Sequence, residues 1–254
     1  MIFFKKGRRA MGLLVKEKSE KAHLTRYDHQ RFELRRKLCR FLLHQIAFRF
    51  LAKIDRIEGL ENVPPKGPGI VMINHIAFVD PMVVLAYLPR NVVPLAKIEA
   101  FHYPVIGIFP KIWAAIPVMR EGFDREAIKQ ALRVLEAGEL LLMAPEGTRN
   151  PSLRDAREGV AYLGSKSGAP IIPVVVTGTE GFPSISPSRW RGAGALIQVG
   201  SPFRFLPKSK RLDRQMLKQM TDESMYVLAR MLPEHRRGEY SNLEAATTEM
   251  IEFL

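Results

Sequence analysis

The sequence predicts an α/β protein with a mostly parallel central sheet flanked by helices, preceded by a basic amphipathic helical segment. Apolar runs of strand length alternate with longer segments that carry helix start and stop signals, which is typical of a parallel sheet. A chain of 254 residues with 46% apolar and 26% charged residues is globular rather than disordered. Residues 1–53 hold 15 of the 39 Lys and Arg but only four acids, so this segment carries +11 of the net charge of +13.

The amino-terminal segment is predicted to contact a polyanion. Residues 27–53 contain neither Pro nor Gly, so one or two helices fit there. Arg36, Arg40 and His44 recur at four-residue spacing beside bulky apolar side chains, which favours a helix on an anionic membrane surface with its basic side chains reaching the headgroups. The alternative is an ordinary helix packed on the core. No nucleic-acid partner is predicted, because aromatic platforms and helix-turn-helix spacing are not evident.

We predict two parts, a membrane-association segment over residues 1–55 and an α/β domain over residues 56–254. The Pro- and Gly-rich residues 64–69 form a loop. Asp80 and Pro81 fit a helix start, with Asp80 as the N-cap and Pro81 at the first helical position. In chain order we expect strands at residues 70–73, 91–96, 139–144, 171–177 and 196–199, and helices at residues 82–88, 124–137, 159–166 and 210–232.

The location of the protein is predicted from what the chain contains. No uninterrupted apolar run approaches the ~18 residues of a spanning helix, and Met1–Phe4 places apolar residues before basic ones, the reverse of a signal peptide. Cys39 is the one cysteine, which excludes an intrachain disulfide and fits a reducing compartment. We therefore expect a peripheral (monotopic) protein on the cytoplasmic face of the cell membrane. The six histidines are scattered, so no metal is predicted.

His75 and Asp80 are candidates for general-base chemistry. His75 follows the predicted strand 70–73 directly, and an imidazole with an unperturbed pKa of ~6.5 suits proton abstraction near neutral pH. A carboxylate on its far nitrogen would fix the tautomer and stabilise the imidazolium. Residues five apart on a helix lie about 140° apart, so this pair requires a turn. The alternative is that Asp80 only caps a helix and His75 is an ordinary loop residue.

A second motif, Glu146-Gly147-Thr148-Arg149, follows the predicted strand 139–144. Backbone N–H groups, a hydroxyl and a guanidinium suit phosphate. Lys97 and Arg120 are further candidate phosphate ligands, although each alone is also an ordinary surface charge. Ligands of open α/β sheets bind beyond the carboxyl ends of the strands, so both motifs share one crevice if their strands are neighbours. The alternative is a charged turn with a local Glu–Arg pair.

Four blocks in order give the sequence a family resemblance. They are Asn74-His75-x4-Asp80, Ile116-Pro117-Val118-Met119-Arg120, Pro145-Glu146-Gly147-Thr148-Arg149 and Ile172-Pro173-Val174-Val175. The set resembles the glycerolipid acyltransferases, specifically the 1-acyl-glycerol-3-phosphate acyltransferases, over roughly residues 56–205. Ala77 stands where many members have Ser, Ala144 replaces a common aromatic residue, and Arg157 stands where Lys is frequent.

The resemblance implies a reaction and its residues. A fatty acyl group passes from acyl-CoA or acyl-carrier protein, a co-substrate rather than a bound cofactor, to the hydroxyl of 1-acyl-glycerol-3-phosphate, a lysophospholipid, giving phosphatidic acid. His75 would be the general base and Asp80 its partner. Pro173 would shape the site near the acyl donor. The other implied substrate-binding residues are Asn74, Lys97, Arg120, Glu146, Gly147, Thr148 and Arg149. The alternatives are another lysolipid acceptor, or a catalytically silent lipid- or anion-binding module.

Overall fold

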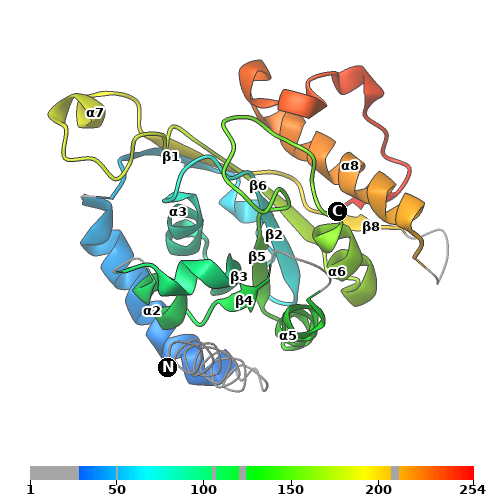
Figure 1. Ribbon diagram of the computed structural model, residues 1–254, viewed down its shortest axis with the longest axis horizontal. Coiled ribbons are helices and arrows are strands. Elements are labelled where there is room, and N and C mark those ends of the chain that lie inside the picture. The colour runs from blue at the N-terminus through cyan, green and yellow to red at the C-terminus, as the bar shows by residue number, and fades with distance from the viewer. Residues whose placement is uncertain (1–28, 50, 105–106, 120–123, 207–211) are drawn as a thin grey trace, which may run out of the picture.

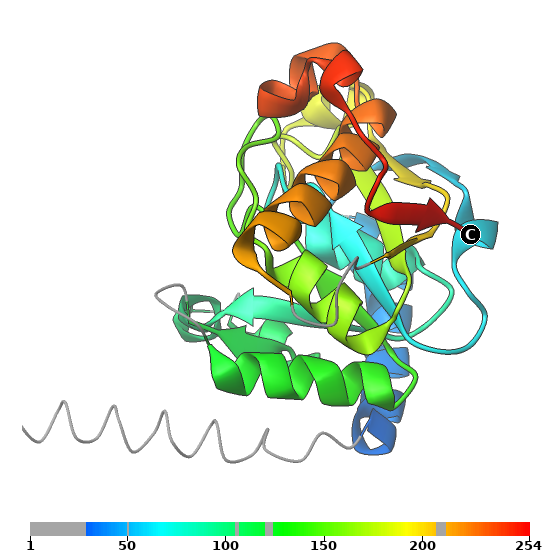
Figure 2. The same ribbon diagram turned by 90° about the vertical axis from the view of Figure 1, so that its right-hand side faces the viewer.

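The computed structural model describes residues 29–49, 51–104, 107–119, 124–206 and 212–254, which form a nine-stranded sheet with helices on both faces (Figures 1 and 2). The strands are β1 (Ile54–Glu58), β2 (Gly69–Ile73), β3 (Val92–Lys97), β4 (Ile116–Val118), β5 (Leu140–Met143), β6 (Ile171–Thr177), β7 (Ala195–Val199), β8 (Phe203–Phe205) and β9 (Ile251–Phe253). The helices are α2 (His29–Gln45), α3 (Asp80–Tyr87), α4 (Ile108–Ile112), α5 (Arg125–Glu136), α6 (Gly159–Ser167), α7 (Pro187–Arg191) and α8 (Arg214–Met231).

The prediction of a mostly parallel sheet is confirmed. The strand order is β1-β7-β6-β2-β5-β3-β4. The strands from β6 to β4 in this order are parallel. Strand β7 is antiparallel to β6 and parallel to β1, and the short strands β8 and β9 add an antiparallel extension. Helical crossovers such as α3 and α5 allow the neighbouring strands to run in the same direction.

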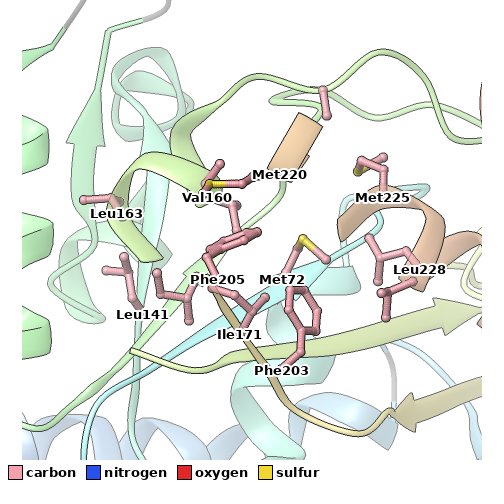
Figure 3. Close-up of a cluster of buried hydrophobic side chains, with 14 of the residues drawn as sticks. Met72, Leu141, Val160, Leu163, Ile171, Phe203, Phe205, Met220, Met225 and Leu228 are labelled. Atoms are coloured by element: carbon pink, nitrogen blue, oxygen red, sulfur yellow. The ribbon is translucent and has the colours of Figure 1, made fainter. Parts of the chain in front are cut away.

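The two faces of the sheet bury different clusters of apolar side chains, because successive residues of a strand point to opposite faces. Ile70 and Met72 of β2 face the helices α5, α6 and α8 (Figure 3). Val71 and Ile73 of the same strand face α3, Leu43 of α2 and the fully buried Trp113. Every residue of β2 is buried, which explains why it reads as a continuous apolar run rather than an alternating one.

The predicted elements recur in the structure with shifts of a few residues at their ends. Four short strands were not predicted, and neither were α4 and α7; β1 reads Ile-Asp-Arg-Ile-Glu, with two charged residues at exposed positions. The predicted boundary after residue 55 falls inside β1. Helix α8 begins at Arg214, where the side chain of Asp213 accepts the N–H of Met216, and the start predicted at residue 210 lies outside the described residues.

Helix α2 turns its basic row toward the protein, which corrects the prediction that Arg36 and Arg40 reach lipid headgroups. The Arg36 side chain is 1% exposed, and its Nε donates to the carbonyl oxygen of Trp113 at 2.9 Å. Arg40 donates to the carbonyl of Leu88, just beyond α3. These carbonyls end helices and lack partners within them, so they accept buried guanidinium groups. The row therefore holds α2 on the domain.

The opposite side of α2, together with Ile46 just after the helix, exposes large apolar side chains. Leu34 is 79% exposed, Leu38 55%, Phe41 60% and Ile46 55%. We call these four residues, with the 43% exposed Leu42, the apolar stripe. Large exposed apolar patches are typical of interaction sites. None of the described helices is both long and apolar enough to cross a membrane.

Candidate active site

A pocket of about 420 Å³ opens beyond the carboxyl ends of β2, β3, β4 and β5. His75 follows β2, Lys97 ends β3, and the loop after β5 supplies Gly147, Thr148 and Arg149. Most of the remaining lining side chains are apolar, among them Phe78 and Met82. Strand β2 pairs directly with β5, so the two sequence motifs share one crevice, as predicted.

His75 and Asp80 form a hydrogen-bonded pair beside this pocket. The His75 Nδ1 lies 3.3 Å from Oδ2 of Asp80, and a turn at residues 77–79 brings them together. The His75 side chain is 19% exposed, whereas that of Asp80 is fully buried. Because Nδ1 faces the carboxylate and the ring lines the pocket, Nε2 is the nitrogen left for a ligand.

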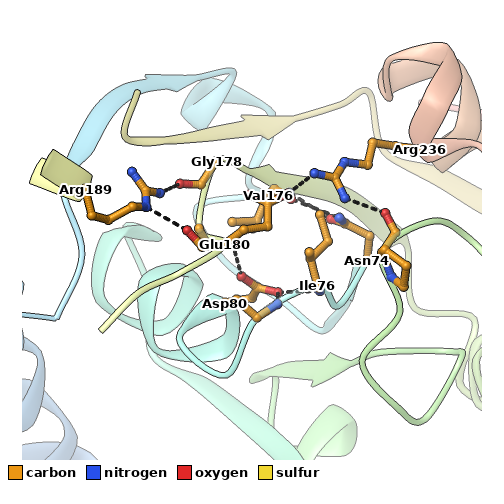
Figure 4. A network of polar contacts seen from close by, with 11 residues as sticks. Asn74, Ile76, Asp80, Val176, Gly178, Glu180, Arg189 and Arg236 are labelled. Carbon is orange, nitrogen blue, oxygen red and sulfur yellow. Dashed lines mark hydrogen bonds and ion pairs between the residues drawn. The ribbon is translucent and has the colours of Figure 1, made fainter. Parts of the chain in front are cut away.

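The Asp80 carboxylate does not serve as the N-cap that the sequence suggested. Helix α3 begins at Asp80 itself, and no side-chain cap bond is present at its start. Oδ2 instead accepts the backbone N–H groups of Ile76 and Ala77 at 2.6 and 2.7 Å (Figure 4). Oδ1 accepts the hydroxyl of Thr179 at 2.6 Å. The carboxylate is thus held rigidly as a hydrogen-bond acceptor, and its buried charge is satisfied.

Asn74 is a structural residue rather than a substrate ligand. Its side chain is 2% exposed and does not line the pocket. The amide donates to the carbonyl of Val176 at 2.9 Å and accepts the N–H of Val176 at 2.8 Å. These two bonds continue the pairing of β2 with β6 one residue past the end of β2. The direct substrate contact predicted for Asn74 is therefore wrong, and its bonds fix the start of the loop that carries His75.

Glu146 does not line the pocket, and its buried carboxylate is hydrogen-bonded within the protein, so its predicted contact with the phosphate stays a prediction. Its Oε1 accepts the side-chain N–H of Asn150 at 3.0 Å and the backbone N–H of Arg154 at 2.9 Å. Burial raises the pKa of the Glu146 carboxyl, although these hydrogen bonds oppose the shift. Gly147 has φ +64°, a left-handed conformation that favours glycine. Glu146 and Gly147 thus shape the loop that presents Thr148 and Arg149.

Three cationic side chains are among the residues that line the pocket. Lys97, Arg149 and Arg157 all line it. Arg149 is exposed, and it has no hydrogen-bond or ion-pair partner among the described residues. Arg120 lies outside the described residues, so its predicted contact stays a prediction. Guanidinium and ammonium groups around one opening suit an anionic ligand such as a phosphate.

Pro173 is buried within β6 and does not line the pocket, so its predicted role near the acyl donor stays a prediction. Its carbonyl accepts the N–H of Gly200, between the end of β7 and the start of β8. A proline fits here because the hydrogen-bonded ladder beside β6 is interrupted between β7 and β8. A backbone N–H donor is therefore not required at this position.

Two residues of the site were not among the sequence predictions. Arg157 lines the pocket, and Thr179 contacts Asp80 from the loop after β6. In the sequence, Arg157 stands out only because it replaces a Lys that is frequent in the family that the chain resembles. Thr179 was detectable in principle, because it follows the carboxyl end of a strand that the sequence placed correctly. Nothing local in the sequence indicates its distant contact.

The arrangement combines an oriented base, cations and an apolar cavity. A neutral imidazole with a carboxylate on Nδ1 accepts a proton at Nε2 and is stabilised when it becomes charged. The apolar lining suits an alkyl chain, and the cations suit a headgroup. No cluster of three or more potential metal ligands occurs within the part of the chain that the structure describes. The site thus fits the activation of a hydroxyl on an anionic amphiphile.

Comparison with known proteins shows what this chain is similar to. The family model described as Acyltransferase matches residues 55–177, which include both motifs. The chain is 32% identical to a 1-acyl-sn-glycerol-3-phosphate acyltransferase of Borreliella burgdorferi over 50% of this chain and 52% of that protein. It is 27% identical to a Bacillus subtilis protein of the same name over 62% of this chain and 80% of the relative. Residues 55–177, about half of the chain, are therefore similar to the acyltransferase family.

More distant proteins carry the same name. The human 1-acyl-sn-glycerol-3-phosphate acyltransferase alpha is 26% identical over 65% of this chain and 60% of its own length. The crystal structure of the 1-acyl-sn-glycerophosphate acyltransferase PlsC from Thermotoga maritima aligns with 90% of this chain and 88% of its own, with 20% identity and a TM-score of 0.49.

Proposed function

We propose that this protein transfers a fatty acyl group from a thioester, acyl-CoA or acyl-carrier protein, to the free hydroxyl of 1-acyl-glycerol-3-phosphate. The observation that carries the proposal is the His75–Asp80 pair at the wall of a mostly apolar pocket that is also lined by three cationic side chains. The relatives named after this reaction support it.

The reaction requires one base and no covalent enzyme intermediate. Nε2 of His75 takes the hydroxyl proton as the oxygen attacks the thioester carbonyl. The C–S bond then breaks, and the leaving thiolate takes the proton from the imidazolium. Asp80 keeps the imidazole in the tautomer with the proton on Nδ1 and stabilises the transient positive charge. The products are phosphatidic acid and the free thiol of the carrier. No metal or bound cofactor enters this scheme.

The acceptor is positioned by the two ends of the pocket. Lys97, Arg149 and Arg157 would hold the phosphate, and Thr148 would add a hydroxyl at the same opening. A phosphate bound by guanidinium groups is fixed in orientation as well as in place, which brings the hydroxyl toward His75. An acyl chain would occupy the apolar part of the pocket, near Phe78 and Met82 of the loop and helix that follow His75.

The acceptor is an amphiphile of the bilayer, so we further propose that the protein docks on the cytoplasmic face of an anionic membrane. The apolar stripe of α2 would enter the interface. The net charge of +13 would add an attraction to anionic lipid, because cations near such a surface contribute roughly 1 kcal/mol each. Arg36 and Arg40 would not take part, since they bond backbone carbonyls within the protein.

A product assay tests this function. Purified protein is given acyl-CoA or acyl-carrier protein together with acceptors that differ only in the headgroup: 1-acyl-glycerol-3-phosphate, its choline ester and its ethanolamine ester. Mass spectrometry identifies the lipid formed. We expect phosphatidic acid with at least one donor and far less product from the two esters, whose phosphates carry less charge. If the acyl group passed only to the choline or ethanolamine ester, the proposed acceptor would be wrong. Specific acceptor binding with no transfer would indicate a binding module.

A further inference from the structure

We propose that Thr179 is a positioning residue for the His75–Asp80 pair, acting through a hydrogen bond from its hydroxyl to Oδ1 of Asp80. This inference rests on the function proposed above. The two oxygens of the Asp80 carboxylate accept hydrogen bonds from different donors. Oδ2 receives the His75 Nδ1 and the two backbone N–H groups of its own loop, whereas Oδ1 receives Thr179 alone among the described residues.

The contact joins two strands that are far apart in the sequence. Thr179 is separated from Asp80 by 99 residues, both side chains are 0% exposed, and the oxygens lie 2.6 Å apart. Asp80 follows β2 and Thr179 follows β6, and these strands are neighbours in the sheet. A hydroxyl donor at this distance from a buried carboxylate is a short, charge-assisted bond. It fixes the rotation of the carboxylate, which determines where Oδ2 meets the imidazole.

The backbone around Thr179 is held from both sides by one guanidinium. Arg189 donates to the carbonyl of Gly178 at 2.6 Å and to that of Glu180 at 2.7 Å, so its two bonds bracket Thr179 (Figure 4). The Arg189 guanidinium also stacks on the ring of Phe182, 3.8 Å from its centroid. The backbone on both sides of Thr179 is therefore fixed.

The next residue ties this loop to the other side of the site. The carboxylate of Glu180 pairs with Arg236, and Arg236 also donates to the carbonyl of Pro151 at 2.6 Å (Figure 4). Pro151 lies in the loop that follows β5 and carries Arg149. The loops after β5 and β6 are thus joined by one bridge. The position of Thr179 is therefore also supported from the loop after β5, besides its own bond to Asp80.

Removal of the hydroxyl should affect the reaction more than binding. In Thr179→Val the side chain keeps nearly the same volume, but Oδ1 of Asp80 is left buried without a donor. The carboxylate then keeps only the bonds to Oδ2, so its orientation and that of the imidazole are less tightly fixed. Loss of a hydrogen bond to a charged group predicts a fall in kcat of roughly ten- to a hundredfold. KM for the acceptor should change by less than about threefold, because no group that holds the phosphate is touched.

The experiment compares Thr179→Val, Thr179→Ser and the control Thr177→Val. Thr177 ends the same strand, and its hydroxyl has no hydrogen-bond partner among the described residues. The wild-type protein is assayed first with acyl-CoA and 1-acyl-glycerol-3-phosphate, so absence of turnover there would refute the proposed function rather than this inference. We expect Thr179→Ser to keep most of the activity, because the hydroxyl remains, and Thr177→Val to resemble wild type.

Two results would overturn the inference. One is a kcat within twofold of wild type for folded Thr179→Val protein. The other is an equal loss for Thr179→Ser and Thr179→Val, which would assign the effect to the shape of the side chain instead of its hydroxyl. Thermal unfolding of each variant shows whether it folds. If Thr179→Val does not fold, Thr179→Ala replaces it and is judged by the same two outcomes, because it also removes the hydroxyl.

Discussion

At the scale of single residues, the site depends on one buried carboxylate with four hydrogen-bond donors. Asp80 receives His75, the N–H groups of Ile76 and Ala77, and Thr179. The spacing of His75 and Asp80 predicted their pairing correctly, because a five-residue turn is a local feature. The direct substrate contact predicted for Asn74 was wrong, because Asn74 bonds Val176 across 102 residues. The predicted contact of Glu146 with the phosphate stays a prediction, and its carboxylate bonds Asn150 and the backbone of Arg154.

Arg149 should contribute to acceptor affinity. We expect Arg149→Ala to raise KM for 1-acyl-glycerol-3-phosphate, with little change in KM for the thioester. A charge-assisted hydrogen bond is worth roughly ten- to a hundredfold in affinity. The lower part of that range applies because Arg149 is exposed and screened by water. Steady-state kinetics with each substrate varied give the answer, and Arg230→Ala, an exposed arginine of α8, is the control. If Arg149→Ala changed only the KM for the thioester, Arg149 would bind the acyl donor instead of the acceptor.

Glu146 should lower stability at neutral pH. Burial raises its pKa in the folded protein, so the folded state holds this proton more tightly than the unfolded state. Wild type and Glu146→Gln should then have similar free energies of unfolding below the unfolded pKa of ~4.3. As the pH rises through the folded pKa, wild type should lose stability relative to the variant.

Denaturant unfolding at several pH values checks this difference. Glu136→Gln, an exposed carboxyl of α5, controls for the loss of one negative charge from a basic chain. A variant that is less stable than wild type at pH 7 would mean that the hydrogen bonds from Asn150 and Arg154 outweigh the cost of burial.

At the scale of elements, α2 shows what periodicity alone does and does not predict. The absence of Pro and Gly correctly predicted a helix, and the four-residue spacing correctly placed Arg36 and Arg40 on one face. The direction of that face was wrong. Whether a row of arginines meets water or the protein depends on the free carbonyls at Leu88 and Trp113, which belong to elements about 50 to 80 residues away. The membrane prediction now rests on the opposite face of the helix.

The apolar stripe should carry membrane binding. We expect Leu38→Gln with Phe41→Gln to reduce co-sedimentation with anionic vesicles strongly, also at high salt, because full burial of each side chain is worth up to ~1.5–3 kcal/mol. Lys37→Gln on the same helix should weaken the free energy of vesicle binding by roughly 1 kcal/mol or less, and only at low salt. Turnover of a short-chain, water-soluble acceptor should be unchanged in both variants. Vesicle binding that survives the double substitution would place the docking surface elsewhere.

At the scale of the whole molecule, the sheet brings separate motifs together. Strand β5 lies between β2 and β3, although it follows both in the sequence. This order places the His75 loop, Lys97 and the Arg149 loop around one pocket. The sequence predicted the sheet and this convergence, because apolar runs and caps are local signals and parallel strands share one carboxyl edge. It did not predict the reversed direction of β7 or the pairing of β1 with it, which depend on packing between remote segments.

The central claim is that His75 is the base of an acyl transfer. The most direct test measures phosphatidic acid formed from acyl-CoA or acyl-carrier protein and 1-acyl-glycerol-3-phosphate by wild type and by His75→Ala. Circular dichroism and thermal unfolding establish that the variant is folded. General-base catalysis predicts a loss of kcat of roughly 10²–10⁴-fold with acceptor binding retained, because the phosphate contacts remain in place. Near-normal turnover by folded His75→Ala protein would contradict the account.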